Sequence, residues 1–172
     1  MRRAPLVVAL SLVVAMSLFD HGDVVHAQVI CSGQTRQLGW SLYGSAGGDL
    51  IDCSGSTANL VIIGLDGNDI LIGGHGRDVL IGGNGEDFLF GRGGNDFLNG
   101  GNDSDALFGA AGDDTLKAGG GPDLLIGGSG RDALFGGDGD DVLFGGHGID
   151  LCDGQAGDDF AGSDCEGPIN IP

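Results

Sequence analysis

Basic residues are scarce in this sequence. Seven Lys and Arg stand against 25 Asp and Glu, which gives a net charge of −18. A protein that binds nucleic acid needs a basic surface, so this composition argues against a nucleic-acid partner. A chain this acidic either stays soluble and swollen or binds cations. Cations are therefore the first partners to consider.

Long apolar runs are also scarce, because the sequence has only one, from Leu6 to Phe19. Two arginines precede this run and Val25-His26-Ala27 follows it, a pattern typical of a secretory signal peptide cleaved before Gln28. We therefore expect residues 1–27 to be a signal peptide and the protein to be secreted into the extracellular space. The run is short for a membrane-spanning helix and no second one follows, so we expect no transmembrane anchor in the mature chain.

Glycine is abundant, and its spacing is regular. Glycine and proline together make up 42 of 172 residues, near the level typical of disordered chains. From Gly64 to Gly162, however, one nine-residue unit is repeated eleven times, with Gly at positions 1 and 4 in ten units and Leu at position 8 in nine. This strict period favours a solenoid over a disordered chain. Position 6 is Asp in all eleven units: Asp69, Asp78, Asp87, Asp96, Asp105, Asp114, Asp123, Asp132, Asp141, Asp150 and Asp159.

The unit predicts an all-β fold. Its first six residues are turn material, because glycine permits positive backbone angles, and its last three suit a short strand. One reversal per unit means that two units return the chain to its starting direction. We therefore expect coils stacked as parallel strands, with odd and even repeats in two opposed sheets and the eighth-position leucines between them. Residues 64–162 would form this parallel β-roll.

The flanking segments are predicted to close its ends. Residues 28–63 would form an N-terminal cap that contains one degenerate repeat, residues 44–52, and an eleven-residue break in phase, residues 53–63. Residues 163–172 would be a C-terminal tail. Export favours disulfide formation, and four cysteines permit three connectivities. An extended array keeps its ends apart, so we favour Cys31–Cys53 and Cys152–Cys165, one disulfide at each end.

The repeated aspartates indicate how the coils are held together. Nine leucines cannot offset the conformational entropy of ninety-nine ordered residues. Stacking also places the sixth-position carboxylates in columns, which repel each other unless a cation lies between them. Carboxylate and glycine carbonyl oxygens suit Ca²⁺ better than Mg²⁺ or Zn²⁺. Pairs such as Asp69/Asp87 and Asp78/Asp96 would give up to about nine calcium sites.

These units resemble the RTX (repeats-in-toxin, haemolysin-type) calcium-binding nonapeptide repeat, GGxGxDxUx. The units that begin at Gly82 and Gly136 match it at every defined position. The resemblance implies a right-handed parallel β-roll that holds Ca²⁺ between stacked turns, ligated by the turn glycines and the eleven aspartates, and that folds when calcium is supplied. Departures in the middle of the array place the Asp105/Asp123 pair in most doubt: Asp103, Ala110, Ala111, Ala118 and Pro122.

No catalytic motif accompanies the repeats, since no nucleophile stands with a base and the carboxylates recur too uniformly for one active site. We therefore expect a non-enzymatic calcium-binding module with a structural or interaction role. The alternative is a secreted haemolysin-like or enzyme-associated protein whose active domain is absent from this chain. A third hypothesis is an acidic cation buffer that never folds.

Positions 7 and 9 flank the inward leucine and should face solvent. In odd repeats they are almost all apolar, which predicts an exposed apolar stripe that mediates self-association or binds a protein partner. Alternatively, position 9 curls inward and is partly buried. The odd-repeat positions are Ile70, Ile72, Phe88, Phe90, Ala106, Phe108, Leu124, Ile126, Val142, Phe144, Phe160 and Gly162.

Overall fold

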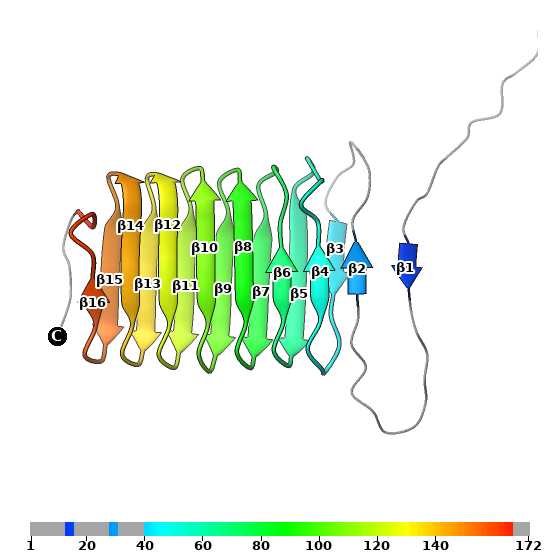
Figure 1. Ribbon diagram of the computed structural model, residues 1–172, viewed down its shortest axis with the longest axis horizontal. Helices are drawn as coiled ribbons and strands as arrows, with labels where there is room; N and C mark the ends of the chain where they lie inside the picture. Colours follow the sequence, from blue (N-terminus) through cyan, green and yellow to red (C-terminus); the bar gives the residue numbers. More distant parts are fainter. Residues whose placement is uncertain (1–12, 16–27, 31–39, 167–172) are drawn as a thin grey trace, which may run out of the picture.

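A computed structural model describes residues 13–15, 28–30 and 40–166, and within these residues every regular element is a β-strand. The strands form an elongated roll with β16 at one end (Figure 1). They are β1 (Val13–Ala15), β2 (Gln28–Ile30), β3 (Trp40–Tyr43), β4 (Leu50–Asp52), β5 (Leu60–Asp66), β6 (Ile70–Ile72), β7 (Val79–Asn84), β8 (Phe88–Gly93), β9 (Phe97–Asn102), β10 (Ala106–Ala111), β11 (Thr115–Gly120), β12 (Leu124–Gly130), β13 (Ala133–Asp138), β14 (Val142–Gly148), β15 (Leu151–Ala156) and β16 (Phe160–Ala161).

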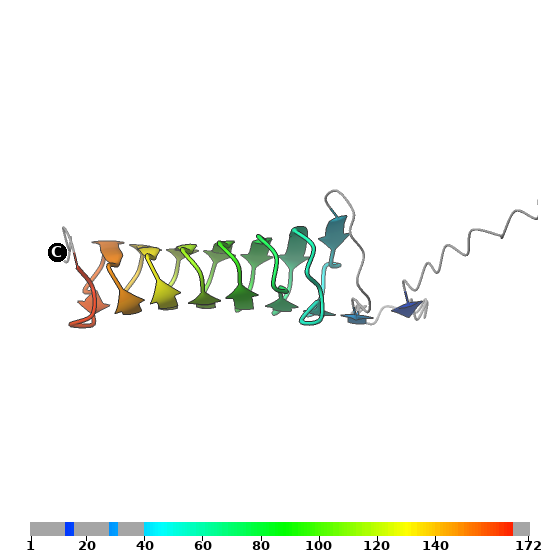
Figure 2. The same cartoon turned by 90° about the horizontal axis from the view of Figure 1, so that it is seen from above.

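From β2 onward the strands alternate between two sheets that face each other (Figure 2). One sheet has nine strands in the order β1-β2-β4-β6-β8-β10-β12-β14-β16, and the other has seven in the order β15-β13-β11-β9-β7-β5-β3. Neighbours within each sheet are parallel, apart from the antiparallel pair β1 and β2. In the array each residue pairs with the one eighteen positions away, as Leu107 does with Leu125. The predicted parallel β-roll, with odd and even repeats in opposite sheets, is confirmed.

The strands are longer than the sequence indicates. We expected three strand residues per unit, but β7, for example, runs from Val79 through Asn84 and so includes the first three positions of the next repeat. Position 2 keeps the pairing, as in Gly83 with Gly101, because glycine there takes a positive φ and turns its backbone groups back toward the neighbouring strand. The prediction that the first six positions all belong to the turn was therefore wrong.

The core is a single seam of side chains between the sheets. The nine eighth-position leucines are fully buried, and Ile51 and Ile62 extend the seam into the N-terminal coils. Cys152 continues it at the C-terminal end, where it pairs in register with Leu134. Each coil thus contributes only two large inward side chains.

In ten of the eleven units, positions 2 and 4 take the left-handed backbone region. All five non-glycine residues with positive φ in the described chain stand at one of these positions: Leu65, Arg92, Asp103, Ala110 and Gln155. An L-residue in this region costs about 1–2 kcal/mol relative to its ordinary conformation. The rest of the stack is regular enough to hold these five residues in the conformation that glycine adopts elsewhere in the array.

At the N-terminal end, the coils continue beyond the repeat array. Strand β4 lies in the degenerate repeat and pairs with β6, while β5 comes from the strand-like end of the phase break and pairs with β7. Cys53 is fully buried and disulfide-bonded, and its expected partner, Cys31, lies outside the described residues. The expected signal peptide also lies outside them, apart from Val13–Ala15 in β1.

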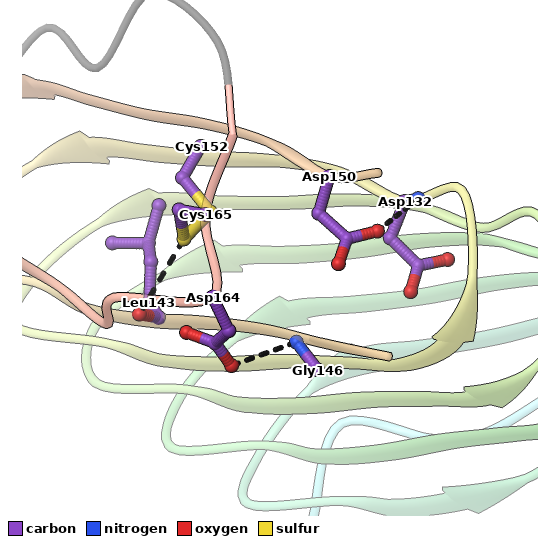
Figure 3. The surroundings of a disulfide bond; sticks show 7 residues. All are labelled: Asp132, Leu143, Gly146, Asp150, Cys152, Asp164 and Cys165. Carbon is purple, nitrogen blue, oxygen red and sulfur yellow. Dashed lines mark hydrogen bonds between the residues drawn. A yellow bond between two sulfur atoms is a disulfide. The ribbon is translucent and has the colours of Figure 1, made fainter. Parts of the chain in front are cut away.

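At the C-terminal end, the tail folds across the last coil (Figure 3). The expected disulfide between Cys152 and Cys165 is present, with a Cα–Cα distance of 5.7 Å. Cys165 forms a parallel bridge with Asp150, and the Glu166 N–H donates to the Asp150 carbonyl oxygen at 2.7 Å. The tail therefore gives the exposed end of the last coil the partners that a further coil would supply.

Among the described residues no helix is long and apolar enough to cross a membrane.

Candidate metal centre

The sixth-position aspartates lie where each turn enters its strand, with their side chains inside the roll. Asp69 through Asp150 expose at most 4% of their surface, while Asp159 in the last repeat is half-buried. Burial of so many carboxylates in register is unusual, because a buried ionised group needs compensating partners. The structure places all eleven predicted residues in two columns, one along each edge of the roll.

One oxygen of each carboxylate has a main-chain partner. Oδ1 of every sixth-position aspartate accepts a hydrogen bond from a main-chain N–H of the preceding coil, at 2.7–3.0 Å. The donor is usually the sixth-position aspartate eighteen residues earlier, as with the Asp105 N–H and Asp123 Oδ1. Each carboxylate therefore joins two successive coils.

The other oxygen has no partner. Oδ2 is buried without any hydrogen bond in ten of the eleven aspartates, and the exception is Asp78, whose Oδ2 accepts from the Gly74 N–H at 2.7 Å. A buried polar atom without a partner costs free energy, more so when it carries charge. The ten are Asp69, Asp87, Asp96, Asp105, Asp114, Asp123, Asp132, Asp141, Asp150 and Asp159.

The unpartnered oxygens lie beside the first-position glycines, where a side chain would not fit. A Cβ built on Gly91 would lie 2.6 Å from Asp96 Oδ2 and 2.9 Å from the carbonyl oxygen of Gly109 in the next coil. The same two kinds of oxygen meet the added Cβ at Gly73 and Gly127. Each such glycine therefore leaves a small space lined by one carboxylate oxygen and one main-chain carbonyl oxygen, which we call the position-1 cradle.

Burial inside the roll opposes ionisation of the carboxyls from Asp69 to Asp141, because it raises the pKa of each. Burial raises the pKa of Asp105 to about 8, and repulsion from Asp87 and Asp123 adds to the shift. Burial likewise raises the pKa of Asp87 and Asp96 to about 7 and that of Asp141 to about 6. The main-chain hydrogen bonds lower these pKa values but do not cancel the shift. Without a cation, the roll disfavours the charged form of its own repeated residue.

This donor set fits a hard divalent cation. It consists only of carboxylate and carbonyl oxygens, which Ca²⁺ accepts in flexible arrangements, and it has no thiolate or imidazole that would favour zinc. The described residues contain no cluster of three or more His, Cys, Asp and Glu side chains. A bound cation would therefore complete its coordination with main-chain oxygens.

The irregular repeats in the middle of the array keep this geometry. Asp123 Oδ1 accepts from the Asp105 N–H at 2.7 Å, as in the regular repeats, although we expected this pair to be the most doubtful. The local change is at Ala118, whose methyl group is fully buried at a position 1 where ten other units have glycine. The irregularity therefore affects the space beside Asp123 more than the placement of its carboxylate.

Two acidic residues outside the predicted set also belong to the columns or their end. Asp49 is buried, and its N–H donates to Asp69 Oδ1 at 2.7 Å; the degenerate repeat was a signal for it in the sequence. Asp164 has a buried Oδ1 without a hydrogen bond, and its Oδ2 accepts from the Gly146 N–H at 2.8 Å (Figure 3). No sequence signal marks Asp164, because it lies beyond the repeat phase.

Comparison with known proteins supports the same chemistry. The family model of the RTX calcium-binding nonapeptide repeat matches the chain in four copies, at residues 61–89, 81–116, 90–125 and 126–161. Together these matches span more than half of the chain. No curated protein and no solved structure gave a significant match to it.

Proposed function

Because the chain belongs to the RTX calcium-binding nonapeptide repeat family, we propose that it is an exported module that folds on calcium binding and has a structural or interaction role. The observation that carries this proposal is the set of ten buried Oδ2 atoms without a hydrogen-bond partner. A native fold rarely leaves so many buried polar atoms unsatisfied. Calcium would satisfy them.

In this proposal the two oxygens of each sixth-position carboxylate have different roles. Oδ1 accepts the main-chain hydrogen bond and fixes the orientation of the carboxylate, as Asp114 Oδ1 does with the Asp96 N–H at 2.8 Å. Oδ2 and the glycine carbonyl oxygens of neighbouring turns hold Ca²⁺, which supplies positive charge between carboxylates that otherwise repel. In this proposal all eleven aspartates, Asp69 through Asp159, are ligands, in up to about nine pairs along the two columns. Asp78 differs from the others, because its Oδ2 would have to exchange the hydrogen bond from the Gly74 N–H for the cation.

Folding then depends on the metal. A cation that binds the stacked coils and not the open chain stabilises the folded state by linkage. Export supplies the metal: if residues 1–27 direct secretion, the chain reaches compartments where calcium is abundant. Extracellular modules bind Ca²⁺ with dissociation constants of about 10⁻⁴–10⁻³ M. At such affinities the chain would stay open before export and fold after it.

The interaction role rests on the outer face of the nine-stranded sheet, where the positions 7 and 9 of odd repeats lie. Ile70, Phe88, Phe144 and Phe160 are exposed there, at 37–55% of their surface, and the other large side chains of this face are half-buried. Position 9 is half-buried in most odd repeats, in line with the second of our two expectations, but Phe144 at this position is exposed. This face would bind a second copy or a protein partner.

The alternative function is a secreted haemolysin-like or enzyme-associated role. It would require an active domain, whereas the matched family model describes a calcium-binding repeat. The two described grooves of the surface are open and shallow, and the larger, of about 430 Å³, is lined by turn residues such as Asn68, Glu86 and Pro122. Serine and acidic side chains line both grooves, but no histidine lies among them to act as a general base, so a calcium-binding module has more support than an active site.

A circular-dichroism titration of the exported protein tests the proposal. Calcium should produce a large gain of β-sheet signal, a chelator should abolish it, and Mg²⁺ at the same concentration should produce much less, since Mg²⁺ keeps its water ligands. A protein with the same β-sheet signal in chelator as in calcium would refute calcium-dependent folding. A disordered signal under both conditions would favour the acidic cation buffer.

A further inference from the structure

The outer face of the nine-stranded sheet carries two parallel columns of apolar side chains, because register stacks like positions. Position 7 contributes one column and position 9 the other, as the pairings of Phe88 with Ala106 and of Phe90 with Phe108 show. The columns are Ile70, Phe88, Ala106, Leu124, Val142 and Phe160, and Ile72, Phe90, Phe108, Ile126 and Phe144. Neither column contains a charged or polar residue.

The opposite sheet differs in this respect. Its outer columns include Asn99, Thr115, Lys117 and Asp153. The Lys117 amine lies 5.9 Å from the ring centroid of Phe97 and 5.8 Å from that of Phe135, which gives two aromatic rings of this sheet a charged neighbour. Only the nine-stranded sheet has an unbroken apolar outer face along the repeat array.

Ring contacts along the columns hold this face in one shape. Phe90 and Phe108 stack with centroids 4.8 Å apart and an interplanar angle of 6°, and Phe144 meets Phe160 edge-on at 5.9 Å. Side chains already fixed by their neighbours lose little entropy when a partner covers them. The face is therefore organised for contact before any partner binds.

The exposed area is near what a dimer needs. With about 200 Å² for a fully exposed aromatic side chain, the four exposed side chains and the half-buried ones beside them correspond to roughly 600 Å² of apolar surface per copy. Two such faces would bury about 1,200 Å², the lower end of the range for specific protein–protein interfaces. A monomer rarely exposes a larger continuous apolar patch.

We propose that the partner is a second copy of this chain and that two rolls pack face to face through their nine-stranded sheets. This inference rests on the calcium-dependent folding proposed above. The two columns carry no charge to attract a charged partner, although the same sheet contains Asp52 and the exposed Arg92 and the chain carries −18. The acidic turns lie at the rim of such an interface, where bound calcium offsets their repulsion. Both copies have the same rise per coil, so the contact made at one coil is repeated at each of the remaining coils.

A two-fold axis along the roll suits the side-chain sizes. It sets the position 7 column of one copy against the position 9 column of the other, as in an isologous interface. Ala106, the smallest member of its column, then lies opposite Phe108 of the second copy. The ring of Phe108 fills the gap that Ala106 leaves between Phe88 and Leu124.

Sedimentation velocity of the calcium-loaded exported protein over a range of concentrations tests the inference, with circular dichroism as a separate check of folding. We expect a dimer that dissociates on dilution. Phe88→Thr should weaken dimerisation at least tenfold, because it removes an exposed ring that lies within the apolar face between Ile70 and Ala106. Phe97→Thr is the matched control, at the same repeat position on the opposite sheet, and should leave the dimer unchanged.

The outcomes separate this inference from the proposed function. A β-sheet signal that depends on calcium, together with a monomer at every concentration, would overturn the dimer and leave the calcium module intact. Equal weakening by Phe88→Thr and Phe97→Thr would also overturn it. A folded monomer that cosediments with neutral phosphatidylcholine vesicles would assign the face to a lipid surface instead.

Discussion

The main-chain N–H of Asp87 donates a hydrogen bond to Oδ1 of Asp105 at 2.9 Å, while Oδ2 of Asp105 is buried without a partner. The same difference between the two carboxylate oxygens recurs along both edges of the roll. Oδ1 makes a hydrogen bond that holds neighbouring coils together, whereas Oδ2 remains available to a ligand. A substitution that changes only one of the two oxygens can therefore separate the structural role from the metal-binding role.

Asp105→Asn should test this separation. Asn retains an oxygen that can accept the hydrogen bond from the Asp87 N–H, but it replaces the charged Oδ2 with an amide NH₂ group, which cannot ligate Ca²⁺. We expect the calcium concentration at the folding midpoint to rise at least tenfold, equivalent to about 1.4 kcal/mol or more of lost binding. Asp103→Asn, at an exposed residue two positions away, is the control and should change the midpoint far less. Equal midpoints for Asp105→Asn and the unsubstituted protein would exclude Asp105 Oδ2 as a ligand.

Acidification should stabilise the metal-free roll but weaken its binding of calcium. Burial raises the folded-state pKa of Asp87, Asp96 and Asp105 from 3.8 to about 7–8, so the metal-free roll binds more protons than the unfolded chain between these values. Protonation of these buried carboxyls therefore stabilises the metal-free folded state. The stabilisation is complete below about pH 4 and is lost as the pH rises through 7–8. The metal-free protein should therefore gain β-sheet signal on acidification toward pH 4.

Protons should compete with calcium over the same range. Because bound Ca²⁺ requires the ionised carboxylates, each ion that binds the already folded roll should displace protons, so calcium binding to the acid-folded protein should weaken as the pH falls from 8 to 5. Circular dichroism at fixed ionic strength measures the acid-induced folding, and isothermal titration calorimetry of the folded protein measures the calcium affinity. A calcium affinity of the folded roll that does not change with pH would show that the buried carboxyls are not the ligands.

At the position-1 cradle, removing a methyl group and adding one should have opposite effects on the number of calcium ions bound. Ala118→Gly should open the cradle beside Asp123 and increase the number of calcium ions bound, whereas Gly91→Ala should close the one beside Asp96 and decrease it. Isothermal titration calorimetry gives both numbers. Ala133→Gly, at a strand position away from any cradle, controls for the glycine itself, which weakens a strand by roughly 0.5–1 kcal/mol. Two variants that bind as many ions as the unsubstituted protein would show that the cradle has no part in calcium binding.

The C-terminal disulfide should lower the calcium requirement for folding. Cys152 and Cys165 are 13 residues apart in sequence, and closing a loop of that size stabilises a fold by about 3 kcal/mol. The double variant Cys152→Leu/Cys165→Ser removes this disulfide but extends the leucine seam, so it separates loss of the crosslink from loss of packing. We expect a higher calcium midpoint for the variant, measured by circular dichroism. If a reducing agent raises the calcium midpoint of the unsubstituted protein but not that of this variant, the effect of reduction is due to the Cys152–Cys165 disulfide.

Much of the fold was predictable because the residue types within each nine-residue unit define its turn and its strand. The period of nine, the glycines and the inward leucines define one turn and one strand per unit, and the constant phase of Asp69 through Asp159 places those carboxylates on two edges. These features follow from backbone freedom and side-chain burial within a few residues, which a sequence displays directly.

Other features depended on contacts between residues eighteen or more positions apart. Only the stacked coils decided that positions 1–3 join the strands, that Oδ1 and Oδ2 have different surroundings, and that Asp78 alone satisfies both oxygens. Asp164 could not be found from the repeat, because the tail reaches Gly146 only after the chain has folded across its last coil. Sequence determined which residue types recur; the tertiary structure decided which atoms of them remain without a partner, since that depends on the neighbouring coil.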